Sequence, residues 1–152
     1  MKTIIAIDPG AGGGIAVHET GCPDVAVPML KTQGDTVAFL GSVHSPCVCF
    51  LEVVSGFAGA KQPGSAMFKF GESYGFIKGV IQALNIPLVL VRPQEWQKMF
   101  ALGTARACES RTVWKNKLKA EAQRRFPALT VTLKTADALL LLEYAKTRPE
   151  AL

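Results

Sequence analysis

Apolar residues and turn residues alternate along the start of the chain in a pattern typical of β-strands. Residues 3–7 form a short apolar run that ends at Asp8, and residues 9–14 are rich in glycine. Glycine adopts turn conformations without a steric penalty, so residues 15–17 are expected to return as a second strand. Residues 24–30 are predicted to form a third strand, which gives an antiparallel meander.

The pattern of apolar residues in the middle of the chain predicts strands that alternate with helices. Residues 35–43 favour a short helix, and residues 47–51 are almost wholly apolar, as in a central strand buried on both faces. Apolar residues then recur at helical spacing over residues 65–84. Residues 86–91 form another apolar run, so we expect parallel strands joined by helices after the meander.

The last third of the chain is predicted to be mainly helical. Pro93 favours the first turn of a helix, where its missing N–H costs nothing. Ser110 or Thr112 can cap a longer helix that ends at Phe126. Residues 129–133 are ambiguous, and a final helix is expected from about Thr135 to Thr147.

Together these elements predict one domain over residues 1–152, long enough for one sizeable core. The expected fold class is α/β: a mixed five-stranded sheet, with an antiparallel meander followed by parallel strands, flanked by helices. No apolar run reaches the roughly 18 residues of a membrane span. The first eight residues lack the features of a signal peptide, so we expect a cytoplasmic protein.

Three acidic residues stand where the apolar pattern leaves little room for a charge. Asp8 closes the first strand, Glu52 closes the central strand, and Asp137 begins the last helix among apolar neighbours. If the first and fourth strands are neighbours, Asp8 and Glu52 lie side by side at one edge of the sheet. Buried carboxylates need a partner or a metal. Two Mg²⁺ ions held by these oxygens would clamp a scissile phosphate and activate water.

Each acid also has an ordinary structural interpretation. Asp8 can be a turn residue, Glu52 can pair with a lysine, and Asp137 can be a favourable charge in the first turn of a helix. Their joint occurrence at strand ends and in an apolar helix is what favours a metal site.

Five short segments along the chain carry a family resemblance. They are residues 5–10 (IAIDPG), 50–52 (FLE), 67–75 (MFKFGESYG), 91–96 (VRPQEW) and 135–140 (TADALL). In this order they resemble segments of RuvC-type Holliday junction resolvases, which belong to the ribonuclease H-like superfamily. The resemblance covers nearly the whole chain, and the five segments in order are more specific than any one of them.

The resemblance implies a crossover junction endodeoxyribonuclease of DNA recombination and repair. Such an enzyme hydrolyses phosphodiesters with two Mg²⁺ ions, for which Mn²⁺ can substitute. It acts as a homodimer that makes paired nicks across a four-way DNA junction. Carried over to this chain, Asp8 would bridge the metals, and Glu52 and Asp137 would complete their shells.

The chain departs from the family pattern just before the last acid. The family usually has a fourth acidic or histidine ligand three or four residues earlier, where this chain has Lys134 and Leu133. Lys134 is therefore a candidate catalytic residue that contacts the scissile phosphate. Alternatively it weakens the second metal site, as a natural or an engineered substitution, and leaves a protein that binds junctions with little or no cleavage.

Basic residues form a candidate DNA-binding surface on a chain with a formal net charge of +5. Arg111, Lys115 and Lys119 recur every four residues and form one helical stripe, expected to follow DNA phosphates. An ordinary solvated helix face is the alternative. The further basic residues assigned to this surface are Arg106, Lys117, Arg124 and Arg125.

The glycine-rich segment after Glu52 holds two further candidates for DNA binding. Phe57 can enter the junction centre and unstack bases as a wedge, or it can be a plain packing residue. Lys61 is expected to contact the DNA backbone.

Three glycines at four-residue spacing mark the helix predicted over residues 65–84. Gly71, Gly75 and Gly79 each cost roughly 1 kcal/mol of helix stability relative to alanine. They also form a smooth groove, which is expected to pack against the sheet or against the same helix of a second subunit.

Three other functions compete with junction cleavage. Actin-like ATPases and sugar kinases also place an aspartate and glycines after a first strand, but they need two such domains to enclose a nucleotide. A different ribonuclease H-like nuclease, acting on RNA, flaps or forks, and a junction-binding protein without catalysis both remain open.

Overall fold

The computed structural model describes residues 3–44, 46–54 and 64–151. The strands are β1 (Thr3–Asp8), β2 (Gly14–His18), β3 (Val25–Pro28), β4 (Cys47–Glu52) and β5 (Leu88–Val91). The helices are α1 (Gln33–Gly41), α2 (Gly64–Ala83), α3 (Pro93–Gln97), α4 (Arg111–Arg125) and α5 (Ala136–Lys146). Short 3₁₀ turns lie at Lys98–Phe100, Ala105–Ala107 and Pro149–Ala151. No helix within the described ranges is long and apolar enough to cross a membrane.

The five strands form one mixed sheet in the order β3-β2-β1-β4-β5. Strands β1, β2 and β3 pair antiparallel, whereas β4 runs parallel to both β1 and β5. This arrangement confirms the predicted fold class, the meander, and the expectation that the first and fourth strands are neighbours. The register pairs Ile7 with Leu51, so the next residue of each strand is an acid of the candidate site.

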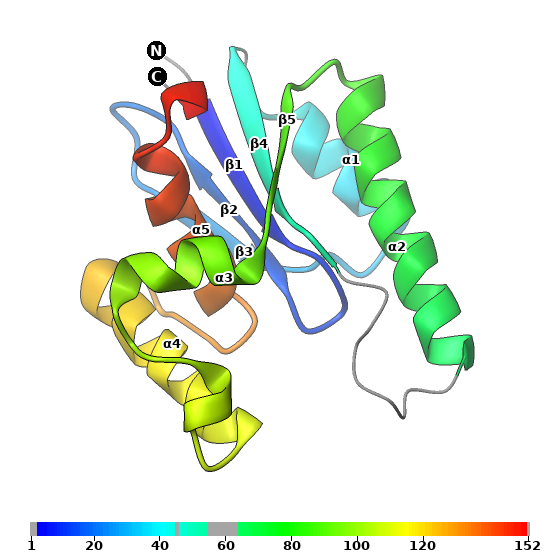
Figure 1. Cartoon of the computed structure of the whole chain (residues 1–152). Coiled ribbons are helices and arrows are strands. Elements are labelled where there is room, and N and C mark those ends of the chain that lie inside the picture. Colours follow the sequence, from blue (N-terminus) through cyan, green and yellow to red (C-terminus); the bar gives the residue numbers. More distant parts are fainter. Residues whose placement is uncertain (1–2, 45, 55–63, 152) are drawn as a thin grey trace.

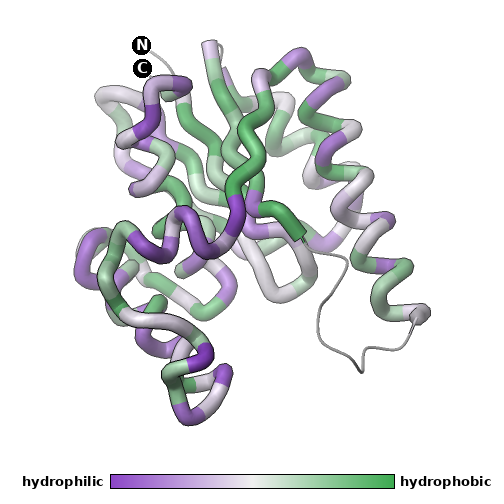
Figure 2. The backbone as a smooth tube through the Cα atoms, in the orientation of Figure 1, coloured by the Kyte–Doolittle hydropathy of each residue, from purple (hydrophilic) through white to green (hydrophobic). Residues whose placement is uncertain are grey.

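Helices cover both faces of the sheet, and Figure 1 shows α1 and α2 on one side and α3, α4 and α5 on the other. The side chains of β4 alternate between two hydrophobic clusters. Val48 and Phe50 pack with α3, α4 and α5, and Cys47, Cys49 and Leu51 pack with α1 and α2. The strand is therefore buried on both faces, as its apolar sequence predicts, and its hydrophobic character stands out in Figure 2.

Most element boundaries lie within a few residues of those expected. Ser110 caps α4, because its hydroxyl accepts a hydrogen bond from the Val113 N–H at 3.2 Å. The helix that Pro93 begins ends at Gln97, and the 3₁₀ turn that follows it ends at Ala101, which takes a left-handed conformation with φ of 52°. The ambiguous residues 129–133 form neither a helix nor a strand.

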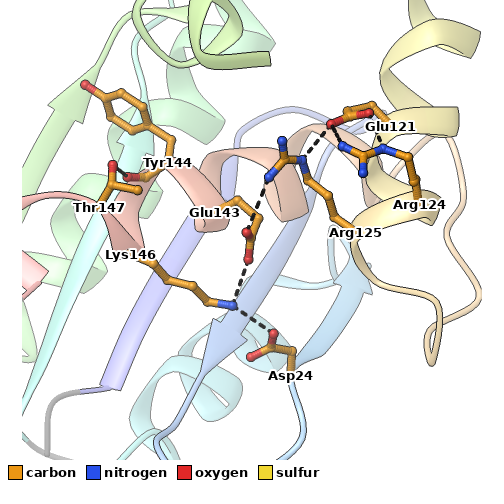
Figure 3. A network of polar contacts seen from close by, with 8 residues as sticks. All are labelled: Asp24, Glu121, Arg124, Arg125, Glu143, Tyr144, Lys146 and Thr147. Carbon is orange, nitrogen blue, oxygen red and sulfur yellow. Dashed lines mark hydrogen bonds and ion pairs between the residues drawn. The ribbon is translucent and has the colours of Figure 1, made fainter.

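A network of charged side chains joins α4, α5 and the start of β3 (Figure 3). Lys146 binds Asp24 and Glu143, each at 2.9 Å, and Arg125 lies 3.8 Å from Glu143. Arg125 also binds Glu121 at 2.6 Å on its own helix. The network fixes α5 against α4, and these two helices carry the groups of the candidate site described next.

Candidate active site

Two of the three predicted acids lie side by side at one edge of the sheet. Asp8 is the last residue of β1 and Glu52 is the last residue of β4, and these neighbouring strands are parallel and in register. The carboxyl ends of parallel strands meet at one edge, so both side chains enter the same cleft. The apolar residues that precede each acid hold it there, because they form the centre of the sheet.

The third acid approaches from the helical layer. Asp137 lies in the first turn of α5 with only 3% of its surface exposed. One of its oxygens, Oδ2, accepts a hydrogen bond from the Lys115 ammonium, which reaches it from α4. Among the described residues the other oxygen, Oδ1, is buried and has no hydrogen-bond partner. A buried carboxylate oxygen without a partner is costly.

Burial and neighbouring acids raise the proton affinity of Asp8 and Glu52. Burial, followed by repulsion from Glu52 and Asp137, raises the pKa of Asp8 from 3.8 to about 8, against the opposing effect of Lys115 and Arg111. Burial raises the pKa of Glu52 from 4.5 to about 7, and repulsion from Asp137 adds to this effect. Burial lowers the pKa of Lys115, but attraction to Asp137 and then to Asp8 and Glu52 raises it overall. Such mutual perturbation in a cleft is typical of an active site.

A buried tryptophan orients Glu52. The indole N–H of Trp96 donates a hydrogen bond of 2.7 Å to Glu52 Oε2. Trp96 lies in α3, is fully buried, and packs edge-on against Phe100. The bond favours the ionised carboxylate and lowers the pKa of Glu52 against the effect of burial. The indole therefore fixes one oxygen of Glu52, a residue that lines the cleft described below.

The substitution Trp96→Phe is expected to raise the pKa of Glu52 above about 7. A hydrogen bond to a charged group contributes about 1.5–3 kcal/mol, which corresponds to about one pH unit or more. Carbon-13 NMR of the glutamate carboxyl groups, followed against pH in metal-free protein, measures this shift. Trp114→Phe is the matched control, since Trp114 is buried in the same cluster on α4. Equal pKa values of Glu52 in both variants would show that the bond has no electrostatic role.

The cleft around the acids has a volume of about 500 Å³. Its lining residues are Asp8 to Gly13, Glu52 to Val54, Phe70, Pro93, Arg111, Lys115 and Leu133. The turn after β1 closes tightly beneath it: a Cβ on Gly13 would lie 2.0 Å from the carbonyl oxygen of Asp8. Gly10 has φ of 107° and lies against the ring of Phe70. Glycine is required at Gly13 because the Asp8 carbonyl leaves no room for a side chain, and at Gly10 because φ is positive.

The donor set suits a hard divalent cation such as Mg²⁺. Asp8, Glu52 and the unpartnered Oδ1 of Asp137 supply oxygen atoms whose mutual repulsion a cation would relieve. Within the described residues, no three His, Cys, Asp or Glu side chains are already arranged as a metal cage. Mg²⁺ usually binds through one or two carboxylates and completes its shell with water and substrate phosphate. Asp8 and Glu52, which both line the cleft, therefore fit the ion as a pair of carboxylate ligands.

Comparisons of the whole chain with known proteins agree with this geometry at the level of the fold. No protein-family model matches the chain, and no curated protein sequence matches it. The structure of RuvC from Thermus thermophilus superposes with a TM-score of 0.58 at 16% identity, covering 92% of this chain and 90% of that one. The T. thermophilus RuvC in complex with a Holliday junction substrate superposes with a TM-score of 0.62 at 14% identity, covering 93% of this chain and 90% of that one. The chain has the RuvC fold.

In this RuvC-like fold, the predicted fourth position of the metal site lies in the turn before α5. Leu133 lines the cleft with about 47% of its surface exposed, and Lys134 lies beside it on the surface. The Lys134 carbonyl approaches β2 so closely that a Cβ on Gly14 would lie 2.7 Å from it. The turn is therefore held against the sheet, and the role of the Lys134 side chain stays a prediction.

The predicted DNA-binding residues occupy different surroundings in the structure. Arg111 and Lys115 line the cleft, Lys117 is exposed, and Lys119 is half-buried further along α4. Arg106 lines a second cavity of about 470 Å³ between α3 and the 3₁₀ turn at Ala105–Ala107. Its other lining residues are Gln94, Gln97, Lys98, Gly103, Thr104 and Ala105. Phe57 and Lys61 lie outside the described residues.

Two arginines assigned to the basic stripe form ion pairs with an acid of their own helix. Arg124 binds Glu121 at 2.7 Å, and Arg125 binds the same carboxylate at 2.6 Å (Figure 3). The Arg125 guanidinium also stacks on the Phe100 ring at 4.7 Å. These contacts give Arg125 a structural role between α4 and its neighbours.

Sequence patterns do not assign two of the groups that shape the site. Trp96 belongs to one of the five family-like segments, but no pattern links its N–H to an acid 44 positions earlier. The basic stripe assigns Lys115 to DNA, whereas the structure pairs it with Asp137. Helical spacing indicates a basic face but does not show that the face turns into the acidic cleft.

Proposed function

We propose that the chain is a metal-dependent endonuclease that resolves four-way DNA junctions. The observation that carries the proposal is the cleft in which Asp8 and Glu52 lie side by side, with Asp137 behind Lys115 and with Arg111 on the rim. Carboxylates of this kind bind a divalent ion, and the neighbouring cations attract a phosphate. The RuvC fold, solved for the T. thermophilus protein with a Holliday junction substrate, supports the choice of substrate.

The reaction is hydrolysis of a phosphodiester. The oxygen of a water molecule bonds to phosphorus, the bond from phosphorus to a sugar oxygen breaks, and that sugar oxygen takes up a proton. A divalent ion supplies Lewis acidity and lowers the pKa of bound water. The protein contributes carboxylates held at fixed strand ends, a tryptophan that orients Glu52, and cations that neutralise charge developing on the phosphate.

The basic surface extends from the cleft, where its residues belong to α4, to the second cavity, where they belong to the 3₁₀ turns after α3. Arg111 and Lys115 are at the cleft, and Arg106 and Lys98 are at the adjoining cavity, which shares α3 with it. We propose that this surface follows the DNA backbone, with Lys134 contributing a phosphate contact from the turn before α5. Contacts of this kind position DNA without reading its sequence.

A homodimer remains part of the proposal, and α2 is the surface suited to it. Gly71, Gly75 and Gly79 have open space above them, since no described residue approaches within 4 Å of their added Cβ positions. Phe68 on the same helix is about 75% exposed. The groove therefore does not pack on the sheet, which leaves the second subunit as its proposed occupant. A twofold pair would match the near-twofold symmetry of a junction.

Cleavage of a labelled synthetic four-way junction in Mg²⁺ or Mn²⁺ tests the proposed function. We expect symmetric paired nicks, and a loss of at least about 10³-fold in rate for Asp8→Asn, because the variant removes a metal ligand at the strand end. Linear duplex, a flap, a fork and an RNA–DNA hybrid serve as the substrate controls.

The controls separate the alternatives. Preferential cleavage of a flap, fork or hybrid would replace the junction with another substrate and keep the nuclease. Tight junction binding without cleavage in either metal would leave a DNA-binding protein, and this result would contradict the proposed enzyme.

A further inference from the structure

The second cavity carries polar side chains that the fold itself does not use. Its volume of about 470 Å³ falls within the roughly 300–1,000 Å³ of pockets that bind small ligands. Gln94 and Gln97 line it from α3, and Lys98 and Arg106 line it from the 3₁₀ turns that follow. Within residues 3–44, 46–54 and 64–151, these four side chains form no hydrogen bond or ion pair. Their donors and acceptors are therefore available to a ligand.

A glutamine with a structural role in this chain has different surroundings. The Gln123 side chain donates to the carbonyl oxygens of Phe126 and Leu129 and accepts from the Val131 N–H, so it holds the turn after α4. Arg125, on the same helix, forms ion pairs with acids. In contrast, no acidic side chain of the described residues lines the second cavity. Its two cations therefore leave the cavity positively charged.

Small residues complete the lining of the second cavity. Gly103, Thr104 and Ala105 are its other lining residues, and φ of Gly103 is 88°. No described atom lies within 4 Å of a Cβ added at Gly103. A flat ring can therefore approach this backbone closely. A hollow of this size admits a group that projects from DNA, but it does not admit the duplex.

The two glutamines favour a nucleobase over a phosphate as the group that enters. A carboxamide presents a donor and an acceptor in one plane, whereas phosphate oxygens only accept. Glutamine forms paired hydrogen bonds of this kind with adenine. Lys98 and Arg106 suit the phosphate to which the base is attached. Pro93 lines the cleft and the next residue, Gln94, lines the cavity, so one DNA strand can reach both.

We propose that the second cavity binds one nucleotide of the junction, turned out of the base stack, and that it selects adenine. Gln94 and Gln97 hydrogen-bond to the base, and Lys98 and Arg106 bind its phosphate. The inference rests on the proposed nuclease function and deepens it, because it gives the enzyme a base preference at one position beside the cut. It assigns to α3 a role in specificity in addition to its support of Glu52.

The test compares the affinity of the full-length chain for labelled four-way junctions with a chelator present, measured by fluorescence anisotropy. One set of junctions varies the base at each position near the crossover, and a second set places there an abasic nucleotide, which keeps the phosphate. For the wild-type chain we expect one position at which adenine binds roughly tenfold more tightly than other bases or an abasic nucleotide. Cleavage in Mn²⁺ should follow the same preference.

Variants assign this preference to the cavity. The double variant Gln94→Leu, Gln97→Leu should lose roughly tenfold in affinity for the adenine junction and nothing further for the abasic one, because both changes remove the same contact. Lys98→Gln should weaken the binding of every junction equally and reduce its dependence on salt. Gln33→Leu is the matched control, since Gln33 is an exposed glutamine of α1, which covers the other side of the sheet (Figure 1).

Each contrary result overturns a defined part of the proposal. A wild-type chain that cuts junctions but responds to no base and no abasic position would overturn the inference alone, and this result does not depend on any variant. A preference that survives in the double glutamine variant would place base selection outside the cavity. Weaker binding in Lys98→Gln without a base preference in the wild-type chain would leave a contact to the DNA backbone only. A chain that neither binds nor cuts any junction would overturn the proposed function as well.

Discussion

Replacement of Asp8 by asparagine is expected to stabilise the metal-free protein at alkaline pH while it removes activity. The folded pKa of Asp8 is about 8, against 3.8 for the unperturbed side chain. Between these values the folded state holds a proton that the unfolded state has lost. The free energy of unfolding contributed by this group therefore falls as pH rises, and the loss is complete above about pH 8.

The free energy of unfolding of Asp8→Asn should exceed that of the wild-type chain by on the order of a few kcal/mol above about pH 8. The difference between the two chains should be small near about pH 4. The asparagine side chain cannot ionise, so the variant avoids the cost of a buried charge beside Glu52 and Asp137. Urea denaturation of both chains with a chelator present, at about pH 5 and about pH 9, measures this difference in the free energy of unfolding. Saturating Mg²⁺ should restore the stability of the wild-type chain and leave the stability of the variant unchanged. A wild-type chain that is the more stable of the two at about pH 9 without metal would contradict the assigned electrostatics.

The second large effect is expected at the turn that carries Asp8 into the cleft. Gly13→Ala should lower the free energy of unfolding by about 3 kcal/mol or more, because its Cβ would lie 2.0 Å from the Asp8 carbonyl oxygen. The chain must shift at Asp8, a ligand of the proposed metal site, so the affinity for Mn²⁺ should also fall.

Gly12→Ala is the matched control for this turn. No described atom lies within 4 Å of the Cβ that would be added at Gly12, and the residue is exposed. Its effect on stability should stay within about 0.5 kcal/mol. Denaturation of both variants, with calorimetric titration of Mn²⁺, provides the comparison. Equal stabilities would mean that the turn adapts without moving Asp8.

The sheet and the acids at its edge could be predicted because they follow from local patterns. The run of apolar residues before Asp8 and before Glu52 indicated two buried strands, and their parallel pairing brings the ends together. The placement of Asp137 followed from an apolar helix with one acid in its first turn. These features depend on periodicity, which a single sequence contains.

Contacts between distant elements could not be predicted in the same way. The bond from Trp96 to Glu52 depends on how α3 lies against the end of β4, and no spacing along the chain contains this information. The contact of Arg125 with Glu143 depends on the packing of α4 against α5. Spacing along a helix indicates a shared face, but it does not identify what that face meets.

The division of the fold into two clusters has a consequence for protein engineering. Trp96, Lys115 and Asp137 come from helices on one side of the sheet, whereas the exposed glycines of α2 lie on the helix that covers the other side (Figure 1). The sheet separates these three side chains from the glycine surface of α2, and Phe70 is a residue of α2 that still reaches the cleft. Substitutions at the exposed glycines should therefore alter the proposed dimer surface without touching Trp96, Lys115 or Asp137, as long as Phe70 is kept.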